Sequence, residues 1–194
     1  MMQKLTGKAL GRPGWLLVLA LVLLLACSAA AAQFSAQMVV RDGEKLALGK
    51  IFMQDGKIRQ EFDDEEGQTI TIVRPDLKKV WVILSREHGF LELPLKTKLP
   101  GQFIQIPPDA LAKRLVGKET VNGYEAEKYE VTVPGSLDPE RQTIWMAIKL
   151  GVPIKLVSSD KNFSVEYRYI IEGPQPERLF NLPPGYKKLS APAG

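Results

Sequence analysis

The chain has 194 residues, of which 26 are Lys or Arg and 22 are Asp or Glu, so its formal net charge is +4. Three of the basic residues and none of the acidic ones lie in residues 1–26, which leaves the rest with 23 bases against 22 acids, a net charge of +1. This near balance gives no electrostatic footprint for nucleic-acid binding, and we expect no nucleic-acid partner. The single cysteine, Cys27, excludes an internal disulfide framework, so a folded domain has to rest on its apolar core.

Residues 1–32 have the layout of a secretory signal peptide. A basic start precedes an apolar run, Trp15–Ala26, that is too short to span a bilayer, and small residues follow. Cleavage after Ala32 suits an ordinary signal peptidase, which requires small side chains before the cut. The alternative is a lipoprotein signal, residues 1–26, because Leu24-Leu25-Ala26-Cys27 resembles the lipobox that ends in a lipid-modified cysteine. The protein is therefore predicted to be periplasmic or, if Cys27 is lipidated, anchored to the outer membrane, with no membrane-spanning segment after processing.

After the signal, short runs rich in Val, Ile, Tyr and Thr alternate with turn signals, which is typical of consecutive β-strands. Asp42-Gly43, Asp55-Gly56 and Asn122-Gly123 are dipeptides of tight turns, because Asp and Asn tolerate the left-handed conformation and Gly adopts it without strain. We expect one mostly antiparallel domain over residues 33–189, followed by a flexible tail at residues 190–194.

Alternation within the strands indicates which side chains are buried. Val165, Tyr167 and Tyr169 fall on one face of a predicted strand, which is typical of an antiparallel sheet with one wet face. By contrast, residues 70–73 and 80–84 are apolar or nearly so on both faces. These two segments are predicted to be central strands with another part of the chain packed over their second face.

A short helix is predicted around residues 107–117. Pro107-Pro108-Asp109 suits a first turn, Leu111 and Leu115 fall four residues apart on one face, and Gly117 stands where a helix would end. A helix this short is marginal alone, so we expect its two leucines to dock on the sheet as a cover.

A series of phrases runs in order through the chain after the signal: Phe34-Ser35-Ala36-Gln37-Met38, Gly49-Lys50-Ile51, Lys57-Ile58-Arg59-Gln60-Glu61, Thr71-Ile72-Val73-Arg74-Pro75-Asp76, Lys79-Val80-Trp81-Val82, Val121-Asn122-Gly123-Tyr124-Glu125-Ala126-Glu127-Lys128-Tyr129, Gly151-Val152-Pro153-Ile154-Lys155 and Phe180-Asn181-Leu182-Pro183-Pro184-Gly185-Tyr186. In their order these phrases resemble exported proteins similar to the lipoprotein carriers LolA and LolB. The resemblance covers nearly all of Phe34 to Leu189, and it is closest to the uncharacterised periplasmic branch of this superfamily.

The resemblance implies a mainly β fold: an incurved antiparallel sheet, or unclosed half-barrel, whose concave apolar side is covered by short helices. In the carriers this hollow accepts the acyl chains of lipoproteins, and each CH₂ removed from water contributes roughly 0.8 kcal/mol. An arginine on an early strand helps to hold the lid in the carriers, and Arg59 lies on a comparable strand of this chain.

Five residues are candidates to line such a hollow: Trp81, Trp145, Tyr167, Leu111 and Leu115. The alternative for the three aromatic residues is an ordinary core, which large aromatic side chains routinely fill. The Leu111/Leu115 helix is either a movable lid or a fixed cover.

No catalytic, metal or cofactor site is predicted. His88 is the only histidine, and it has no cysteine or second histidine with which to form a metal shell or a nucleophile pair. Asp63-Asp64-Glu65-Glu66 lacks the spaced ligands of a calcium loop and is predicted to keep a hairpin tip soluble.

Two functions remain open from the sequence. The first is non-enzymatic binding of a lipid, acyl chain or lipoprotein in the concave half-barrel. The second is a protein-interaction or envelope-stress sensory module of the same fold, in which the concave side is a filled core. The first requires an accessible apolar cavity under the cover, whereas the second requires that space to be filled.

Overall fold

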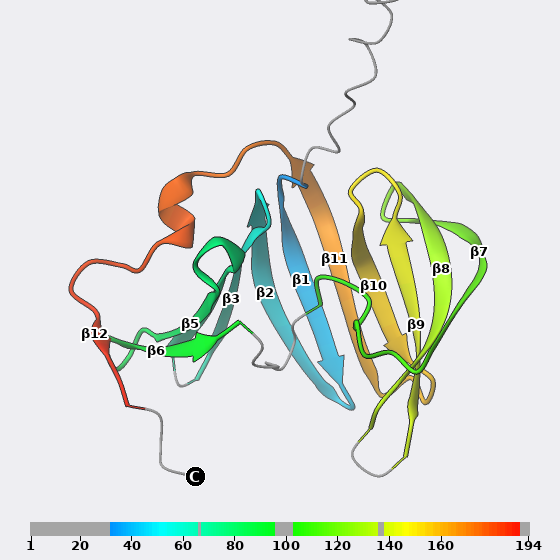
Figure 1. The fold of residues 1–194 in the computed structure, drawn as a ribbon, viewed down its shortest axis with the longest axis horizontal. Coiled ribbons are helices and arrows are strands. Elements are labelled where there is room, and N and C mark those ends of the chain that lie inside the picture. Colours follow the sequence, from blue (N-terminus) through cyan, green and yellow to red (C-terminus); the bar gives the residue numbers. More distant parts are fainter. Residues whose placement is uncertain (1–31, 66, 96–102, 136–137, 191–194) are drawn as a thin grey trace, which may run out of the picture. The chain divides into compact units, whose positions relative to one another are not determined.

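The computed structural model describes residues 32–65, 67–95, 103–135 and 138–190. Its strands form one sheet in the order β12-β6-β5-β4-β3-β2-β1-β11-β10-β9-β8-β7, and all neighbours are antiparallel except the short β12–β6 pair (Figure 1). The strands are β1 (Phe34–Asp42), β2 (Lys45–Gln54), β3 (Lys57–Asp64), β4 (Gly67–Arg74), β5 (Lys79–Leu84), β6 (Gly89–Pro94), β7 (Ala112–Val121), β8 (Tyr124–Val133), β9 (Glu140–Ala147), β10 (Val152–Ser158), β11 (Phe163–Glu172) and β12 (Lys187–Lys188).

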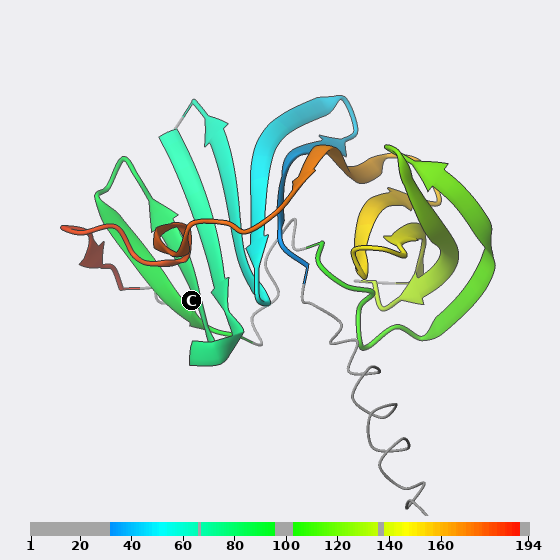
Figure 2. The ribbon, with the colours of Figure 1, turned by 90° about the horizontal axis from the view of Figure 1, so that it is seen from above.

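The sheet is strongly curved, and its β7–β10 end coils round on itself when seen from above (Figure 2). The first and last strands of the order, β12 and β7, do not pair with each other, so the curved sheet stays unclosed. The predicted fold class, an incurved and unclosed antiparallel sheet, is thus confirmed.

The predicted tight turns connect three of the hairpins. Asp55 and Gly56 between β2 and β3 have φ of 51° and 77°, and Asn122 and Gly123 between β7 and β8 have φ of 50° and 84°. Two successive residues with positive φ give the turn whose twist matches that of the flanking strands, which is why Asp-Gly and Asn-Gly occur there. At the β1–β2 turn, Gly43 has φ of 59°.

Strand register divides the β1–β6 part of the sheet into two faces. We call inner face the side that carries the cross-strand row Phe34, Met53, Ile58, Val73 and Val80. We call outer face the side that carries the row Ser35, Phe52, Arg59, Ile72 and Trp81. All five side chains of the inner row are buried, and they belong to the larger of two hydrophobic clusters.

The second cluster covers the outer face of β4–β6, and we call it the outer cluster. The C-terminal segment 174–190, called the strap below, lies over it and inserts Phe180, which is fully buried. The remaining buried members of the outer cluster are Ile70, Ile72, Trp81, Ile83 and Phe90. The prediction that residues 70–73 and 80–84 form central strands packed on both faces is therefore confirmed.

The predicted helix at residues 107–117 is wrong. Leu111 donates its backbone N–H to the carbonyl of Thr132 at 2.8 Å, and Leu115 pairs with Tyr129 across the β7–β8 hairpin. Both leucines are exposed, at 61% and 52%, so neither docks on the sheet. The four-residue spacing of two leucines is a weak signal, and the Asn122-Gly123 turn that pairs this segment with β8 overrides it. The helical elements of the described residues are two short 3₁₀ turns, η2 (Pro75–Leu77) and η3 (Glu177–Phe180).

The prediction that Tyr169 shares the face of Tyr167 is also wrong. The pairing of β1 with β11 shifts between Ser35 and Gln37, and Tyr169 takes φ of 51° at this irregularity. An extra residue in one strand breaks the two-residue alternation, so the Tyr169 side chain is 79% exposed.

Residues 1–31 of the predicted signal, with Cys27, and the last four residues of the predicted tail lie outside the described residues. Among the residues that are described, no helix combines the length and hydropathy needed to cross a bilayer.

Candidate functional site

A loop, not a helix, covers the inner face. In residues 103–110, Phe103 is only 4% exposed, and Ile104, Ile106 and Ala110 pack partly buried against the larger cluster. The ring of Phe103 meets the ring of Tyr167 edge to face, with centroids 5.8 Å apart, and the ring centroid of Phe34 lies 6.4 Å from that of Tyr167. The 103–110 loop thus places an aromatic side chain where the family resemblance predicted a hollow.

Tyr167 is the residue on which this loop is fastened. It lies on β11 opposite Met38 of β1, is fully buried, and donates its hydroxyl proton to the carbonyl of Phe103. Burial raises the pKa of its hydroxyl, so the group remains a neutral donor at physiological pH. The Asn122 side chain donates to the backbone carbonyl of Tyr167 at 2.8 Å, which ties the β7–β8 turn to β11.

Trp145 belongs to the same large cluster but lies among charged side chains. Its indole N–H donates to Glu119 at 2.8 Å, and the ammonium groups of Lys128 and Lys155 lie 5.2 and 5.1 Å from its ring centroid. Hydrogen bonds from Lys128 and then from Trp145 hold the pKa of the Glu119 carboxyl below its ordinary value. Trp145 is therefore held in place by polar partners on its rim as well as by burial.

Trp81 lies on the opposite face from Tyr167, in the outer cluster. Its indole N–H donates to Glu92 at 3.1 Å, and the guanidinium of Arg74 lies 5.8 Å from its ring centroid. Hydrogen bonds from Trp81, Lys188 and Lys79 lower the pKa of Glu92 to about 2. The three aromatic candidates of the sequence are thus divided between two clusters, and a role in ligand binding stays a prediction for each of them.

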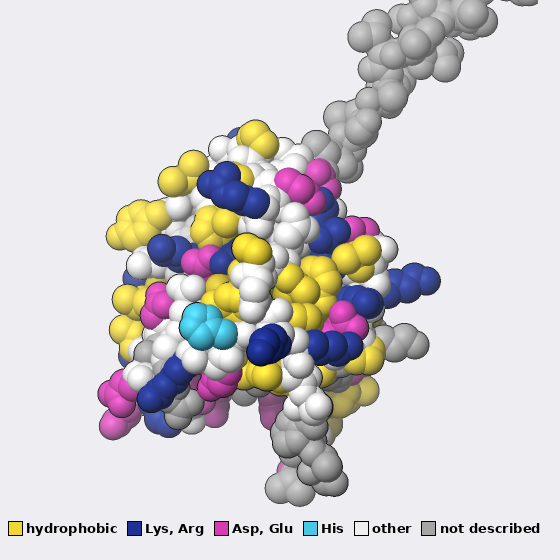
Figure 3. All heavy atoms as spheres, turned by 90° about the vertical axis from the view of Figure 1, so that its left-hand side faces the viewer, with side chains coloured by type: hydrophobic (Ala, Val, Ile, Leu, Met, Phe, Trp, Pro, Cys, Tyr) yellow, Lys and Arg dark blue, Asp and Glu magenta, His cyan; other side chains and the backbone are white. Residues whose placement is uncertain are grey.

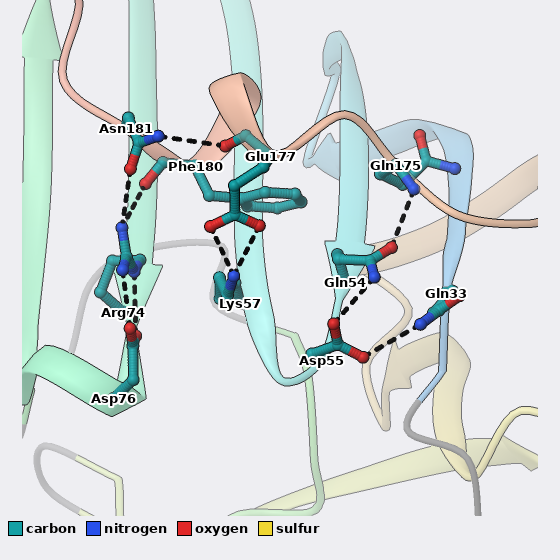
Figure 4. A network of polar contacts seen from close by, with 10 residues as sticks. All are labelled: Gln33, Gln54, Asp55, Lys57, Arg74, Asp76, Gln175, Glu177, Phe180 and Asn181. Carbon is teal, nitrogen blue, oxygen red and sulfur yellow. Dashed lines mark hydrogen bonds and ion pairs between the residues drawn. The ribbon is translucent and has the colours of Figure 1, made fainter.

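Arg59 and Lys57 of β3 hold the start of the strap. Arg59 donates from Nη1 to the carbonyl of Leu179 at 3.0 Å and from Nε to Glu61 at 2.6 Å. Lys57 forms an ion pair with Glu177 at 2.6 Å (Figure 4). The arginine of the family resemblance therefore contacts a covering segment, but this segment lies on the outer face, and its function as a lid contact stays a prediction.

Arg74 of β4 is the second anchor of the strap, and its side chain is nearly buried. Its Nη1 donates to the carbonyl of Phe180 at 2.9 Å and to the Asn181 side chain at 3.0 Å, while two further N–H groups reach both carboxylate oxygens of Asp76 (Figure 4). Such a bidentate pair fixes the plane of the guanidinium and lowers the pKa of Asp76 to about 2. The geometry aims Arg74 at the backbone around the buried Phe180.

Next to the strap, the outer face of β1–β3 and β11 holds a groove of about 380 Å³, which we call the outer groove. Leu48, Tyr169 and Ile171 at this groove are 52%, 79% and 67% exposed, so an apolar surface meets solvent here. The groove is lined by Ser35, Ala36, Gln37, Leu48, Gly49, Lys50, Phe52, Glu61, Asp63, Tyr169 and Ile171.

Three residues that make the two covers were not predicted as site residues from the sequence, namely Phe103, Arg74 and Phe180. A weak signal for the first existed, because Phe103, Ile104 and Ile106 are large apolar residues within a Pro-rich loop. In the described ranges, His, Cys, Asp and Glu side chains do not gather in groups of three or more that fit a metal ion.

An incurved, unclosed antiparallel sheet with an apolar inner face is the LolA-like fold, and the chain has this fold, as the resemblance predicted. An uncharacterised conserved protein from Thermus thermophilus is similar in structure, with a TM-score of 0.59 at 14% identity over 89% of this chain and 98% of that one. The Pseudomonas aeruginosa MucA/MucB complex gives a TM-score of 0.52 at 14% identity over 80% of this chain and 57% of the matched one. The structure of MucB gives a TM-score of 0.50 at 16% identity over 90% of this chain and 66% of the matched chain.

The chain thus spans 57–66% of the matched chains in the MucA/MucB and MucB structures. At these identities the likeness shows the fold alone. No protein-family model matches the sequence, and no curated protein matches it either.

Proposed function

We propose that the chain is a non-enzymatic binding protein of the bacterial envelope, which holds a lipid, an acyl chain or the lipid-bearing part of a lipoprotein against its inner face. The observation that carries this proposal is the cover: Phe103 is buried on Tyr167 by a loop with no helix or strand of its own. The Phe103 side chain occupies the place that we assign to the ligand. The protein would be soluble in the periplasm after cleavage at Ala32, or anchored to the outer membrane if Cys27 is lipidated.

The magnitudes favour exchange of the loop for an acyl chain. Exposing one phenylalanine side chain costs about 1.5–3 kcal/mol, while each acyl CH₂ that enters an apolar site contributes about 0.8 kcal/mol. About four buried methylenes therefore offset exposure of the Phe103 side chain, and a longer chain is needed to offset the loop's other contacts, which include the hydrogen bond from Tyr167. A rigid helix that docked several side chains would resist displacement more strongly than this loop.

The test compares Phe103→Ala with Phe180→Ala, which removes the same side chain from the opposite face. Titration with cis-parinaric acid, a fluorescent fatty acid, should give at least about fivefold tighter binding to Phe103→Ala than to the unaltered protein, because less apolar surface has to be displaced. Phe180→Ala should bind as the unaltered protein does. Lipids that co-purify with the protein from its own envelope are identified by mass spectrometry. If nothing apolar co-purifies and neither the protein nor Phe103→Ala binds the probe, the inner face is a filled core and the proposal is wrong.

A second function, protein interaction or sensing, is favoured by the outer groove. Its exposed Leu48, Tyr169 and Ile171 form an apolar surface that the strap leaves uncovered. MucB, to which the chain is similar in fold, is known in complex with MucA. A photo-crosslinking amino acid at Tyr169 tests this function in the native envelope: a discrete protein adduct that Leu48→Glu abolishes supports it, and the absence of an adduct contradicts it.

A further inference from the structure

The sheet ends at β7 in an open edge. In the described part of the chain no strand lies beyond β7, which is the last strand of the order (Figure 1). Every residue from Ala112 to Thr120 is exposed, and only Val121 at the turn is buried. Half of the backbone N–H and C=O groups of an edge strand point away from the sheet, so this edge presents a template for another strand.

At the opposite edge of the sheet, β6 is covered by the C-terminal segment of the chain. The two residues of β12, Lys187 and Lys188, pair with Gly89 and Phe90 of β6, and Leu189 adds a backbone bond to Phe90 at 2.8 Å. The face on this side shows Lys and Arg interspersed with hydrophobic side chains around the single histidine, His88 (Figure 3). The chain thus protects one edge with its own C-terminal segment and leaves β7 open.

The open edge combines apolar and cationic side chains. Leu111, Leu115 and Val116 are 61%, 52% and 36% exposed at or beside β7. Two of its basic residues, Arg114 and Lys118, form ion pairs with Glu130 and Glu125 of β8 at 2.5 and 3.5 Å, and all four side chains are more than half exposed. Pairs as exposed as these contribute little and exchange readily for another carboxylate.

The basic side chains of β7 favour a different partner over a second copy of the chain as the occupant of this edge. From Ala112 to Val121, β7 carries Lys113, Arg114 and Lys118 but one acid, Glu119, which already accepts from Lys128 and Trp145. Pairing of two β7 strands would therefore bring six basic residues together, and like charges across a sheet are destabilising. The register shift between Leu115 and Gly117 further limits flat self-pairing.

We propose that the β7 edge binds a short, extended and acidic segment of a partner protein, which adds a strand to the sheet. Backbone hydrogen bonds supply the pairing, Leu115 and Val116 supply apolar contact, and Lys113, Arg114 and Lys118 select the acidic segment. This site is independent of the ligand on the inner face and of the outer groove.

The test uses a fluorescein-labelled ten-residue peptide with alternating Glu and Val, followed by fluorescence anisotropy with the purified protein. Binding should saturate below about 1 mM, and the bound peptide should slow hydrogen exchange of β7 amides. A Lys/Val peptide of the same length should not bind. The Glu/Val peptide N-methylated at alternate residues should not bind either, because one edge of the extended peptide then has no backbone N–H groups to donate. Lys118→Glu should weaken binding by about three- to tenfold. Lys45→Glu, the same charge change at the exposed start of β2, should leave it unaltered.

Four results would overturn the proposal: no saturable binding, equal binding of the basic peptide, equal binding of the N-methylated peptide, or equal weakening by the two lysine substitutions. A dimer in sedimentation velocity that protects the β7 amides would also overturn it, because the occupant would then be a second copy. Failure of cis-parinaric acid to bind the inner face has no bearing on these results, so the two proposals fail separately.

Discussion

Phe180→Ala should be among the most destabilising single substitutions in the domain. Phe180 is fully buried in the outer cluster, although it belongs to a surface strap. A phenylalanine buries about 200 Å², which at about 25 cal/mol per Å² corresponds to about 5 kcal/mol as an upper bound. Measured Phe→Ala losses in cores are about 3–5 kcal/mol. Because Arg74 still binds the backbone at this position, we expect a loss of about 3 kcal/mol in the free energy of unfolding.

The assay is equilibrium unfolding in urea, followed by far-UV circular dichroism and tryptophan fluorescence. Leu77→Ala serves as the control, since Leu77 lies on η2 and is 44% exposed, and truncation there should change the unfolding free energy by less than about 0.5 kcal/mol. A loss below about 1 kcal/mol, close to that of Leu77→Ala, would refute the reasoning that the strap is an integral part of the core.

Two further predictions concern charge and close packing. The pKa values of Asp76 and Glu92 are lowered from 3.8 and 4.5 to about 2, so their contribution to stability is complete above about pH 4.5 and is lost as the pH falls towards 2. The protection factors of amides in residues 177–189, which are exchange rates corrected for the intrinsic rate at each pH, should fall over this window. Glu92→Gln should flatten the fall, and an unaltered profile in this variant would contradict the prediction. A Cβ on Gly49 would lie 2.6 Å from the carbonyl oxygen of Glu61, while one on Gly117 would meet no atom within 4 Å. Gly49→Ala should therefore lower the free energy of unfolding by about 1–3 kcal/mol, whereas Gly117→Ala should not lower it. Thermal melts that show equal losses of stability in the two variants would disprove the close approach at Gly49.

Local chemistry made most of the sheet predictable. Asp55-Gly56 and Asn122-Gly123 adopt the positive φ values that their side chains allow, so hairpins could be placed from dipeptides alone. The segment 107–117 was mispredicted as a helix because two leucines at helical spacing, Leu111 and Leu115, are too few to outweigh strand pairing. The segment forms a strand because it pairs with β8, and the spacing of leucines along the chain carries no information about that pairing.

The candidate site was less predictable than the sheet, for reasons that differ between residues. Tyr167 follows from alternation, because Val165 and Tyr167 are both buried on β11. The face on which Trp81 lies could not be predicted in this way, because its strand is apolar on both faces and alternation does not distinguish them. Phe103 lies in a segment without periodicity, and Phe180 is buried in a cluster of residues far away in sequence, where Arg74 and Arg59 hold the backbone beside it.

The two covers of the sheet differ in how they are held, and this difference bears on which face suits the proposed hydrophobic ligand. The strap is fixed by a buried cation on its backbone, Arg74, and by the Lys57–Glu177 ion pair, and departure of the strap would take two acceptors, the Phe180 carbonyl and the Asn181 side chain, from the Arg74 guanidinium. The 103–110 loop is fastened by the neutral bond from Tyr167 and by apolar contact of Phe103. An acyl chain replaces apolar contact, and displacing the loop removes the acceptor of one neutral donor, the Tyr167 hydroxyl, whereas displacing the strap removes acceptors of a charged guanidinium, which costs more. For the proposed hydrophobic ligand, the inner face is therefore the face on which it would compete with the protein's own cover, while the strap would keep the outer cluster closed.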